Sequence, residues 1–303
     1  MNLFSISQLS QFSGIKPHTI RVWEQRYNAL KPERSEGNTR YYDDKQLRRL
    51  LNIVSLMDKD YKVSQLCSMS DENLYSLIQS SGTSNSNDTA EYYINQLIVA
   101  GMAFDSAHFE HIFSLSFSAY GLKDTYKKVI FPVMNRIGLL WASDLMPTAS
   151  EHFLSNIFHQ KLSSAIDALA IPDQSVETWL LFLPENEFHE LPLLYANFLI
   201  RLSGRRVIYL GCNVPIISLK LAFQDIMPDN LLMFLIHFDH PEQIQKDIDS
   251  LNSYFSGHKI YLAGNHKLIS SLKYPKNIEY LQSVTDIENI LGLNEVLINN
   301  SIS

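Results

Sequence analysis

The spacing of apolar residues separates the first quarter of the chain from the rest. Apolar positions at helical intervals predict short helices over 7–12, 17–28 and 43–58. Between the second and third helix lies an irregular polar stretch whose Glu36-Gly37-Asn38 is a turn signal between two short extended arms. This pattern predicts a small domain of three helices and a hairpin over residues 1–75.

The middle of the chain has a longer helical periodicity. Residues 80–88 (SSGTSNSND) are small and polar, with nothing to bury, so we place a linker at 76–88. Four helical stretches follow at roughly 88–101, 104–119, 122–142 and 148–170. Four helices with short connections predict an antiparallel four-helix bundle over 89–172.

The pattern changes again near residue 177. The runs TWLLFLP, RRVIYLG, NLLMFLIHF and KIYLAG are short and apolar on both faces, which is typical of buried parallel strands. Helical stretches near 191–203, 217–227, 241–255 and 285–292 alternate with these runs. The alternation predicts a Rossmann-like, doubly wound α/β domain over 176–303, with ligands near the carboxyl ends of the strands. The fold class is therefore multidomain, combining α and α/β parts.

Charge is distributed unevenly along the chain. The net charge is −7, yet residues 1–69 hold eleven basic and seven acidic side chains. A basic head on an acidic body is expected where only the head meets a polyanion. Cys67 and Cys212 lie far apart and predict no structural disulfide, which fits a reducing cytoplasm. We find neither a signal-peptide pattern nor a membrane-length apolar run, so we expect a cytoplasmic protein without membrane contact.

The head carries a specific sequence pattern. It begins with ISQLSQFSGIKPHTIRVWEQRY and continues with LKPER and then GNTRYY. Over about 70 residues this resembles the MerR family of winged helix-turn-helix regulators. The resemblance implies binding to double-stranded DNA, usually as a dimer on a palindromic or repeated operator. Many metal-sensing members carry cysteines after a long dimerisation helix, and this chain has neither feature.

Candidate DNA-binding residues follow from the position of the second helix. A helix fits the major groove and presents a few side chains near its start to base edges. The residues after the wing turn can reach phosphate or the minor groove. Trp23 and Tyr27, four positions apart, could instead pack inside the head. The candidates are His18, Thr19, Arg21, Trp23, Arg26 and Tyr27 in the second helix, and Arg40 and Tyr41 after the wing turn.

Further motifs occur in order along the body of the chain. They are Trp141, the pair Glu151-His152, the loop E-F-H-E-L-P over 187–192, and Y-L-G-C-N-V-P over 209–215. In this order they resemble the cobalamin-binding module of light-sensing MerR regulators of the CarH and LitR type. Each residue alone could equally be bundle core or a surface histidine, so the order carries the resemblance.

The resemblance implies adenosylcobalamin as the cofactor and His189 as its cobalt ligand, within a loop motif D/E-x-H-x-x-G. It also implies that Trp141, Glu151 and His152 cover the upper, adenosyl face. Imidazole suits a borderline transition metal, and a nearby acid such as Glu187 could orient the ring through its other nitrogen. The implied cofactor-binding set is Trp141, Glu151, His152, Glu187, His189, Gly211 and Gly264.

The sequence departs from this family pattern where the cofactor's nucleotide tail would bind. Pro192 replaces a glycine, whose conformational freedom proline lacks. LIHFDHP over 235–241 lacks the serine of a Ser-x-Leu motif, and Ala263-Gly264 replaces Gly-Gly. A methyl group there would narrow the tail cavity. The pairs His108/His111 and His237/His240 could bind zinc, but a suitably spaced third ligand is missing.

Three hypotheses follow. The first is a repressor whose operator binding and oligomerisation, as dimer or tetramer, are controlled by adenosylcobalamin and light. The second is a cofactor-independent regulator whose degenerate cobalamin module serves oligomerisation or partner binding. The third is a subunit of a cobalamin-dependent methyltransferase or mutase, against which the DNA-binding head argues. We therefore expect a regulator and not an enzyme.

Overall fold

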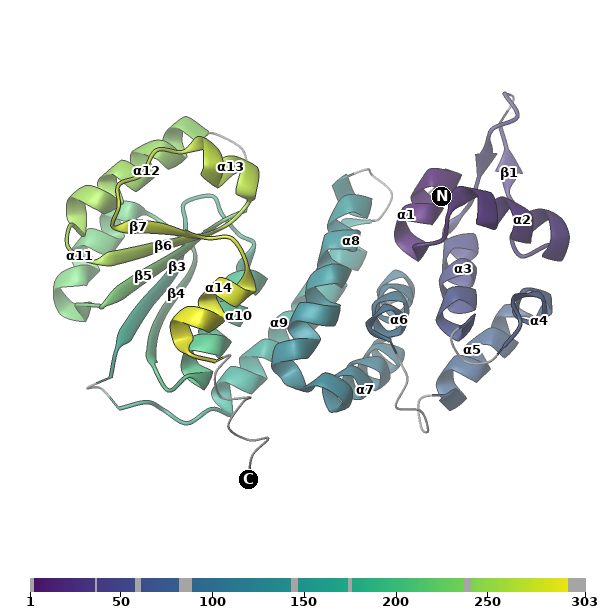
Figure 1. The fold of residues 1–303 in the computed structure, drawn as a ribbon, viewed down its shortest axis with the longest axis horizontal. Helices are drawn as coiled ribbons and strands as arrows, with labels where there is room; N and C mark the ends of the chain where they lie inside the picture. Colours follow the sequence, from purple (N-terminus) through teal and green to yellow (C-terminus); the bar gives the residue numbers. More distant parts are fainter. Residues whose placement is uncertain are drawn as a thin grey trace. The chain divides into compact units, whose positions relative to one another are not determined.

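The computed structural model describes residues 3–35, 37–57, 61–81, 89–142, 147–173, 176–236 and 241–293. The chain divides into two compact units, Met1–Ile157 and Phe158–Ser303, and each is described by itself (Figure 1). Most of the predicted linker, over 82–88, lies outside the described residues, as do His237 and His240. The side chain of Trp141 is also outside the description, although its backbone is helical.

The head in the first unit begins with two short helices and a hairpin. Its first elements are α1 (Ile6–Ser13), α2 (Pro17–Tyr27), β1 (Glu33–Arg34) and β2 (Arg40–Tyr41). The Ser5 hydroxyl accepts from the backbone of Gln8 and begins α1, and proline at the first position begins α2 without losing a hydrogen bond. β1 and β2 pair antiparallel and form the wing. The predicted winged helix-turn-helix is thus confirmed.

Three more helices complete the head. They are α3 (Asp44–Met57), α4 (Val63–Ser68) and α5 (Asp71–Ser81). The sequence pattern predicted no helix between residues 58 and 88 and placed a linker from residue 76. The linker prediction is wrong over residues 76–81, because α5 continues to Ser81. Leu74 and Ile78, four positions apart, are fully buried and stabilise this helix by packing.

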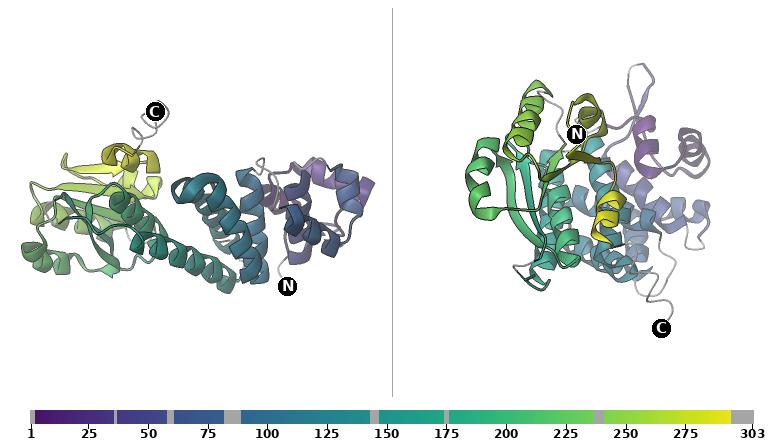
Figure 2. Two further views of the ribbon diagram at one scale, coloured as in Figure 1. Left: turned by 90° about the horizontal axis from the view of Figure 1, so that it is seen from below. Right: turned by 60° about the vertical axis from the view of Figure 1, so that its left-hand side comes forward.

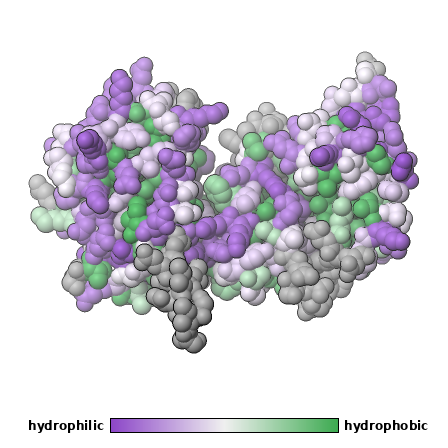
Figure 3. Space-filling model, in the orientation of Figure 1, coloured by the Kyte–Doolittle hydropathy of each residue, from purple (hydrophilic) through white to green (hydrophobic). Residues whose placement is uncertain are grey.

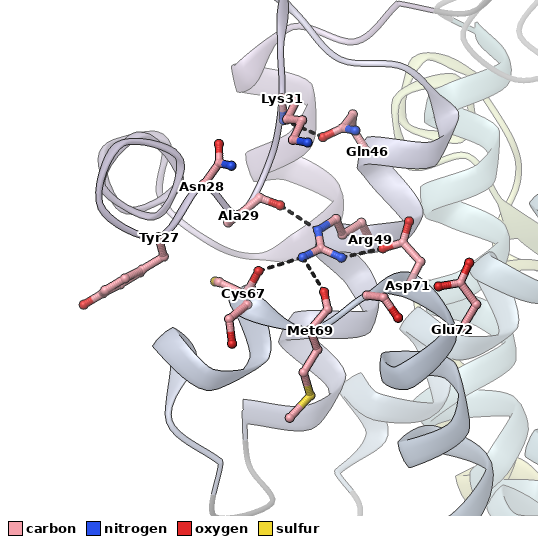
Figure 4. Close-up of a pocket in the computed structure, with 12 residues that line it drawn as sticks. Tyr27, Asn28, Ala29, Lys31, Gln46, Arg49, Cys67, Met69, Asp71 and Glu72 are labelled. Carbon is pink, nitrogen blue, oxygen red and sulfur yellow. Dashed lines mark hydrogen bonds and ion pairs between the residues drawn. The ribbon is translucent and has the colours of Figure 1, made fainter.

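Arg49 holds these helices together (Figure 4). Its guanidinium donates to the carbonyl oxygens of Ala29, Cys67 and Met69 and pairs with the carboxylate of Asp71. Arg49 therefore anchors two segments to α3: the residues just after α2, and the turn between α4 and α5. Arg49 and its partners also line the pocket drawn in Figure 4, and their contacts give these pocket residues a structural role.

Four helices follow the head: α6 (Ala90–Ala103), α7 (Ser106–Thr125), α8 (Phe131–Ala142) and α9 (Thr148–Asp167). A π-helical turn over Tyr126–Ile130 joins α7 to α8, and Gly121 at φ +69° kinks α7. The kink explains why the pattern suggested a break near residue 120. The division between the units falls inside α9, at 157/158, and not at the predicted end of the bundle near 172.

A buried polar layer joins the head to these helices within the first unit. On α6, the Gln96 amide nitrogen donates to Asn52 Oδ1 at 3.2 Å and Ser55 Oγ at 2.9 Å, both on α3. Its Oε1 lies 2.9 Å from His108 Nε2 on α7, and Gln79 of α5 lies 2.8 Å from His108 Nδ1. The docking of the head on the bundle is thus specified by hydrogen bonds as well as apolar packing.

The second unit contains a five-stranded parallel sheet. Its strands β3 (Thr178–Pro184), β4 (Arg206–Val214), β5 (Asn230–Leu235), β6 (Lys259–Gly264) and β7 (Ile278–Leu281) lie in the order β4-β3-β5-β6-β7 (Figures 1 and 2). This order reverses between β3 and β5, where open α/β sheets bind their ligands. The doubly wound α/β prediction is confirmed, although it did not include β7.

Helices cover both faces of the sheet. Apolar residues of α11 (Ile216–Ile226), α12 (Pro241–Tyr254) and α13 (His266–Ser271) pack on one face. α10 (Glu190–Leu202) and α14 (Val284–Leu291) pack against one another and are drawn on the opposite side (Figure 1). In the view of Figure 3 hydrophilic and hydrophobic residues are interspersed over both units. Among the described helices none is long and apolar enough to cross a membrane.

Candidate DNA-binding surface and cofactor loop

The recognition helix α2 presents a polar face. His18 and Arg21 are exposed and lie three positions apart, and Gln25, four positions further, falls on the same helical face. Sequence reasoning missed Gln25, although helical spacing from Arg21 could have found it. Arg26 is exposed, Tyr27 is 37% exposed, and Thr19 is half-buried.

Trp23 points the other way. Its side chain is only 7% exposed, which favours the packing alternative that the i, i+4 spacing had left open. We therefore omit Trp23 from the DNA contacts proposed below.

Glu24 ties the recognition helix to the wing. Its carboxylate accepts from Arg40 Nε at 2.9 Å and from the Tyr42 hydroxyl at 2.9 Å. Burial raises the pKa of Tyr42, and the adjacent Glu24 carboxylate adds to that rise, so its hydroxyl stays a donor. Arg40 and Tyr41 are half-buried, and the pairing with Glu24 gives Arg40 a structural role within the head. Arg34, exposed on the wing, is a basic residue that the candidate set lacked.

Replacing Arg21 by alanine is expected to lower operator affinity about tenfold or more, because a good side-chain contact to a base edge contributes about 1–3 kcal/mol. Titration of a duplex selected from a random pool measures this loss. Lys276→Ala, which removes an exposed positive charge from the second unit, serves as the control and should leave affinity unchanged. Equal affinities of Arg21→Ala and the control would exclude Arg21 from the DNA contact.

The loop between β3 and α10 is organised around a buried carboxylate. Glu187 is 4% exposed, and its Oε1 accepts from the backbone N–H groups of Phe188 and His189, each at 3.0 Å. Its Oε2 accepts from the N–H of Ile236, just beyond β5, at 2.9 Å. The Glu187 carboxylate therefore bridges the ends of β3 and β5, where the strand order reverses.

The same carboxylate orients His189. His189 Nδ1 lies 2.6 Å from Glu187 Oε1, while the imidazole side chain is 56% exposed. A carboxylate partner holds the proton on Nδ1, so that Nε2 carries the lone pair that a metal ligand needs. The residues present thus fit an imidazole ligand to cobalt, and the Nδ1 contact is the one that the sequence predicted for Glu187.

The predicted residues of the bundle belong to the first unit. Glu151 and His152 adjoin near the start of α9, with Glu151 Oε2 2.9 Å from His152 Nδ1 and the His152 side chain 66% exposed. Trp141 lies in α8. The placement of these residues over the face of a cofactor bound at His189 stays a prediction.

The alternative zinc site at His108 and His111 is not supported. Both ring nitrogens of His108 are hydrogen-bonded to glutamine side chains. Within the described part of the chain, no group of three or more His, Cys, Asp or Glu residues could hold a metal ion.

The segments expected to receive a nucleotide tail have structural roles of their own. Pro192 is the third residue of α10, where its missing N–H has no helical acceptor, so the helix has already begun at the family's glycine position. Ala263 is 5% exposed within β6. Asn265 donates to the carbonyl oxygens of Leu235 and Ile236 and closes the ends of β5 and β6 together.

Sequence reasoning missed a second carboxylate network beside His189. Glu190 is the first residue of α10, and its carboxylate contacts the Tyr209 hydroxyl at 3.0 Å and His159 Nε2 at 3.1 Å. These three residues come from α10, β4 and α9, so no sequence spacing relates them.

Comparisons with known proteins cover both parts of the chain. Residues 4–69 match the MerR HTH family regulatory protein, and residues 93–165 match the B12 binding domain. The chain is 26% identical over 230 residues to the HTH-type transcriptional repressor CarH of Myxococcus xanthus, covering 75% of this chain and 76% of that protein. It is 22% identical to the repressor CarA of the same organism, covering 78% of each chain.

Solved structures include proteins of similar fold. The Methanosarcina barkeri monomethylamine corrinoid protein aligns with a TM-score of 0.50 and 11% identity, covering 68% of this chain and all of that chain. At this identity the likeness concerns the fold alone.

Proposed function

Because the chain combines a MerR-type helix-turn-helix domain with a B12-binding domain and is a homologue of CarH and CarA, we propose that its operator binding is controlled by adenosylcobalamin and light. The observation that carries this proposal is the contact of 2.6 Å between Glu187 Oε1 and His189 Nδ1 at the strand-order reversal. It orients an imidazole as a metal ligand before any cofactor is present.

In this proposal each group has a separate task. His189 would hold cobalt through Nε2, and Glu187 would keep the ring in the required tautomer and orientation. Trp141, Glu151 and His152 would cover the adenosyl face. When bound, adenosylcobalamin supplies a carbon–cobalt bond that light can break. On α2, His18 and Arg21 would contact the operator, with self-association as dimer or tetramer matching repeated half-sites.

The proposal is tested with the purified full-length protein. After incubation with adenosylcobalamin in the dark, cobalamin absorbance is expected to co-elute with the protein on gel filtration. His189→Ala should lose the imidazole-ligated spectrum and at least about tenfold in affinity. His258→Ala, at the opposite end of the sheet, is the matched control and should bind as wild type. Operator binding is compared in the dark and after illumination.

A second candidate rests on the tail-binding segments. Ala263, Pro192 and the absence of the family's serine favour a regulator that has lost its cofactor and uses the second unit for oligomerisation or partner binding. This candidate predicts that the cofactor-free protein binds its operator in light and dark alike, and that no cobalamin co-elutes. Co-elution that depends on His189 would exclude it.

A further inference from the structure

Glu190 lies directly after His189 and is anchored on two sides. Its Oε1 accepts from the Tyr209 hydroxyl on β4 at 3.0 Å, and its Oε2 pairs with His159 Nε2 on α9 at 3.1 Å. The Glu190 side chain is 27% exposed and that of His159 is 40% exposed, so their contact is partly shielded from water. Glu190 therefore connects the first turn of α10 to a strand and to a second helix.

The neighbouring backbone leaves room for this carboxylate. Gly211 on β4 has φ +75°, and a Cβ there would lie 3.3 Å from Glu190 Oε1. Such a contact is tighter than side chains usually make, and the conformation itself disfavours other residues. The family resemblance implied a cofactor role for Gly211; in the structure, its lack of a side chain leaves space for Glu190.

The other end of the loop is held independently. The Glu187 carboxylate binds the N–H of Ile236, and the Glu187 carbonyl accepts from the N–H of Asn213 at 3.2 Å. Asn213, in the left-handed region at φ +58°, also accepts from the N–H of Asn186 through its side chain at 3.0 Å. His189 therefore lies between one bracing group two positions before it and another one position after it.

From this geometry we propose that Glu190 is a positioning residue for the cobalt ligand. By anchoring the chain immediately after His189 to α9 and β4, it holds the imidazole in place before the cofactor arrives, which lowers the ordering cost of binding. This inference rests on the proposed cobalamin binding, and it adds that Glu190, His159 and Tyr209 act as one unit. Glu187 orients the ring, whereas Glu190 places the backbone that carries it.

The test uses full-length protein with Glu190→Ala and Glu190→Gln. Alanine removes both contacts. Glutamine can still accept from Tyr209 and can donate to His159, whose other tautomer offers an acceptor at Nε2. We expect alanine to lower affinity for adenosylcobalamin about tenfold and to reduce the imidazole-ligated fraction in the absorption spectrum at fixed pH. Glutamine should restore most of both.

A matched control and a cofactor-free measurement accompany these variants. Glu242→Ala removes an exposed glutamate from the first turn of α12 and should change neither affinity nor spectrum. In cofactor-free protein, amide hydrogen exchange at Phe188 and His189 should accelerate in Glu190→Ala and stay near wild type in Glu190→Gln.

The outcomes separate this inference from the function on which it rests. If wild type binds cobalamin through His189 but Glu190→Ala matches it in spectrum, affinity and exchange, the positioning role is overturned. If wild type binds no cobalamin, the proposed function fails. In that case, faster hydrogen exchange in cofactor-free Glu190→Ala would still support the role of Glu190 in anchoring the loop. Unchanged exchange would overturn that anchoring role too.

Discussion

Replacing Gly264 by alanine is expected to destabilise the second unit by about 3 kcal/mol or more, in the complete absence of a cofactor. Gly264 has φ +125°, a conformation that other residues rarely adopt. A Cβ there would lie 2.2 Å from the carbonyl oxygen of Leu235, on the neighbouring strand β5. That oxygen also accepts from the N–H of Asn265 at 2.7 Å, so moving it away from the new Cβ would weaken this hydrogen bond.

Urea unfolding of the cofactor-free protein measures this effect. Gly257→Ala is the matched control, because Gly257 has φ +100° in the same unit and a Cβ there would meet nothing within 4 Å. It should cost about 1–2 kcal/mol for the backbone conformation alone. Similar losses in the two variants would contradict the steric argument. Unchanged stability in Gly264→Ala would instead restore the expectation that this glycine serves a bound cofactor.

The contrast between the predicted and the observed fold follows from the strength of the apolar pattern. On α3, Leu47, Leu50, Leu51 and Leu56 are fully buried, and such a stripe predicts both the helix and its limits. Strand β3 is buried over its whole length and is equally plain in the sequence. Elements with a large buried face could therefore be predicted to within a few residues.

Short elements at edges could not be predicted in the same way. β7 has four residues at the edge of the sheet, and α13 and α4 have six each. So few positions do not establish a period, and their stability comes from tertiary packing and caps such as Asn265, which accepts from Lys267 and Leu268.

The candidate sites show the same limit. Glu187 and His189 are two positions apart in one loop, so their pairing could be proposed from sequence and the structure shows the contact. His159, Glu190 and Tyr209 come from three different elements, so their spacing in the sequence could not predict that they contact one another. For Trp23 the periodicity allowed either face, and only the packed head shows that the ring is buried.

Acidification is expected to weaken the docking of the head on the bundle. His108 is 2% exposed in the polar layer between α5, α6 and α7, and burial lowers its pKa to about 4, although nearby Asp105 opposes this shift. His111 contributes to lowering it. In the unfolded chain the pKa of histidine returns to about 6.5, so between pH 6.5 and 4 the unfolded state binds more protons than the folded state.

The sign of the effect follows directly. The contribution of His108 to the free energy of unfolding is fully present above about pH 6.5 and decreases as the pH drops toward 4. Between pH 7.5 and 5 this contribution falls by about 2 kcal/mol. The geometry gives the same direction. Gln79 donates to His108 Nδ1 while His108 Nε2 donates to Gln96, an arrangement that only the neutral ring supports.

The measurement compares wild type with His108→Gln by urea unfolding at pH 7.5 and pH 5, with hydrogen exchange in peptides of α6 and α7 to locate the change. Glutamine does not titrate, so the variant should lose about 2 kcal/mol less than wild type on acidification, even if it is less stable at both pH values. Parallel losses would show that His108 does not set the acid sensitivity. Because Gln96 also binds Asn52 and Ser55 of α3, opening this layer by acid would free the head from the helices that match the B12 binding domain.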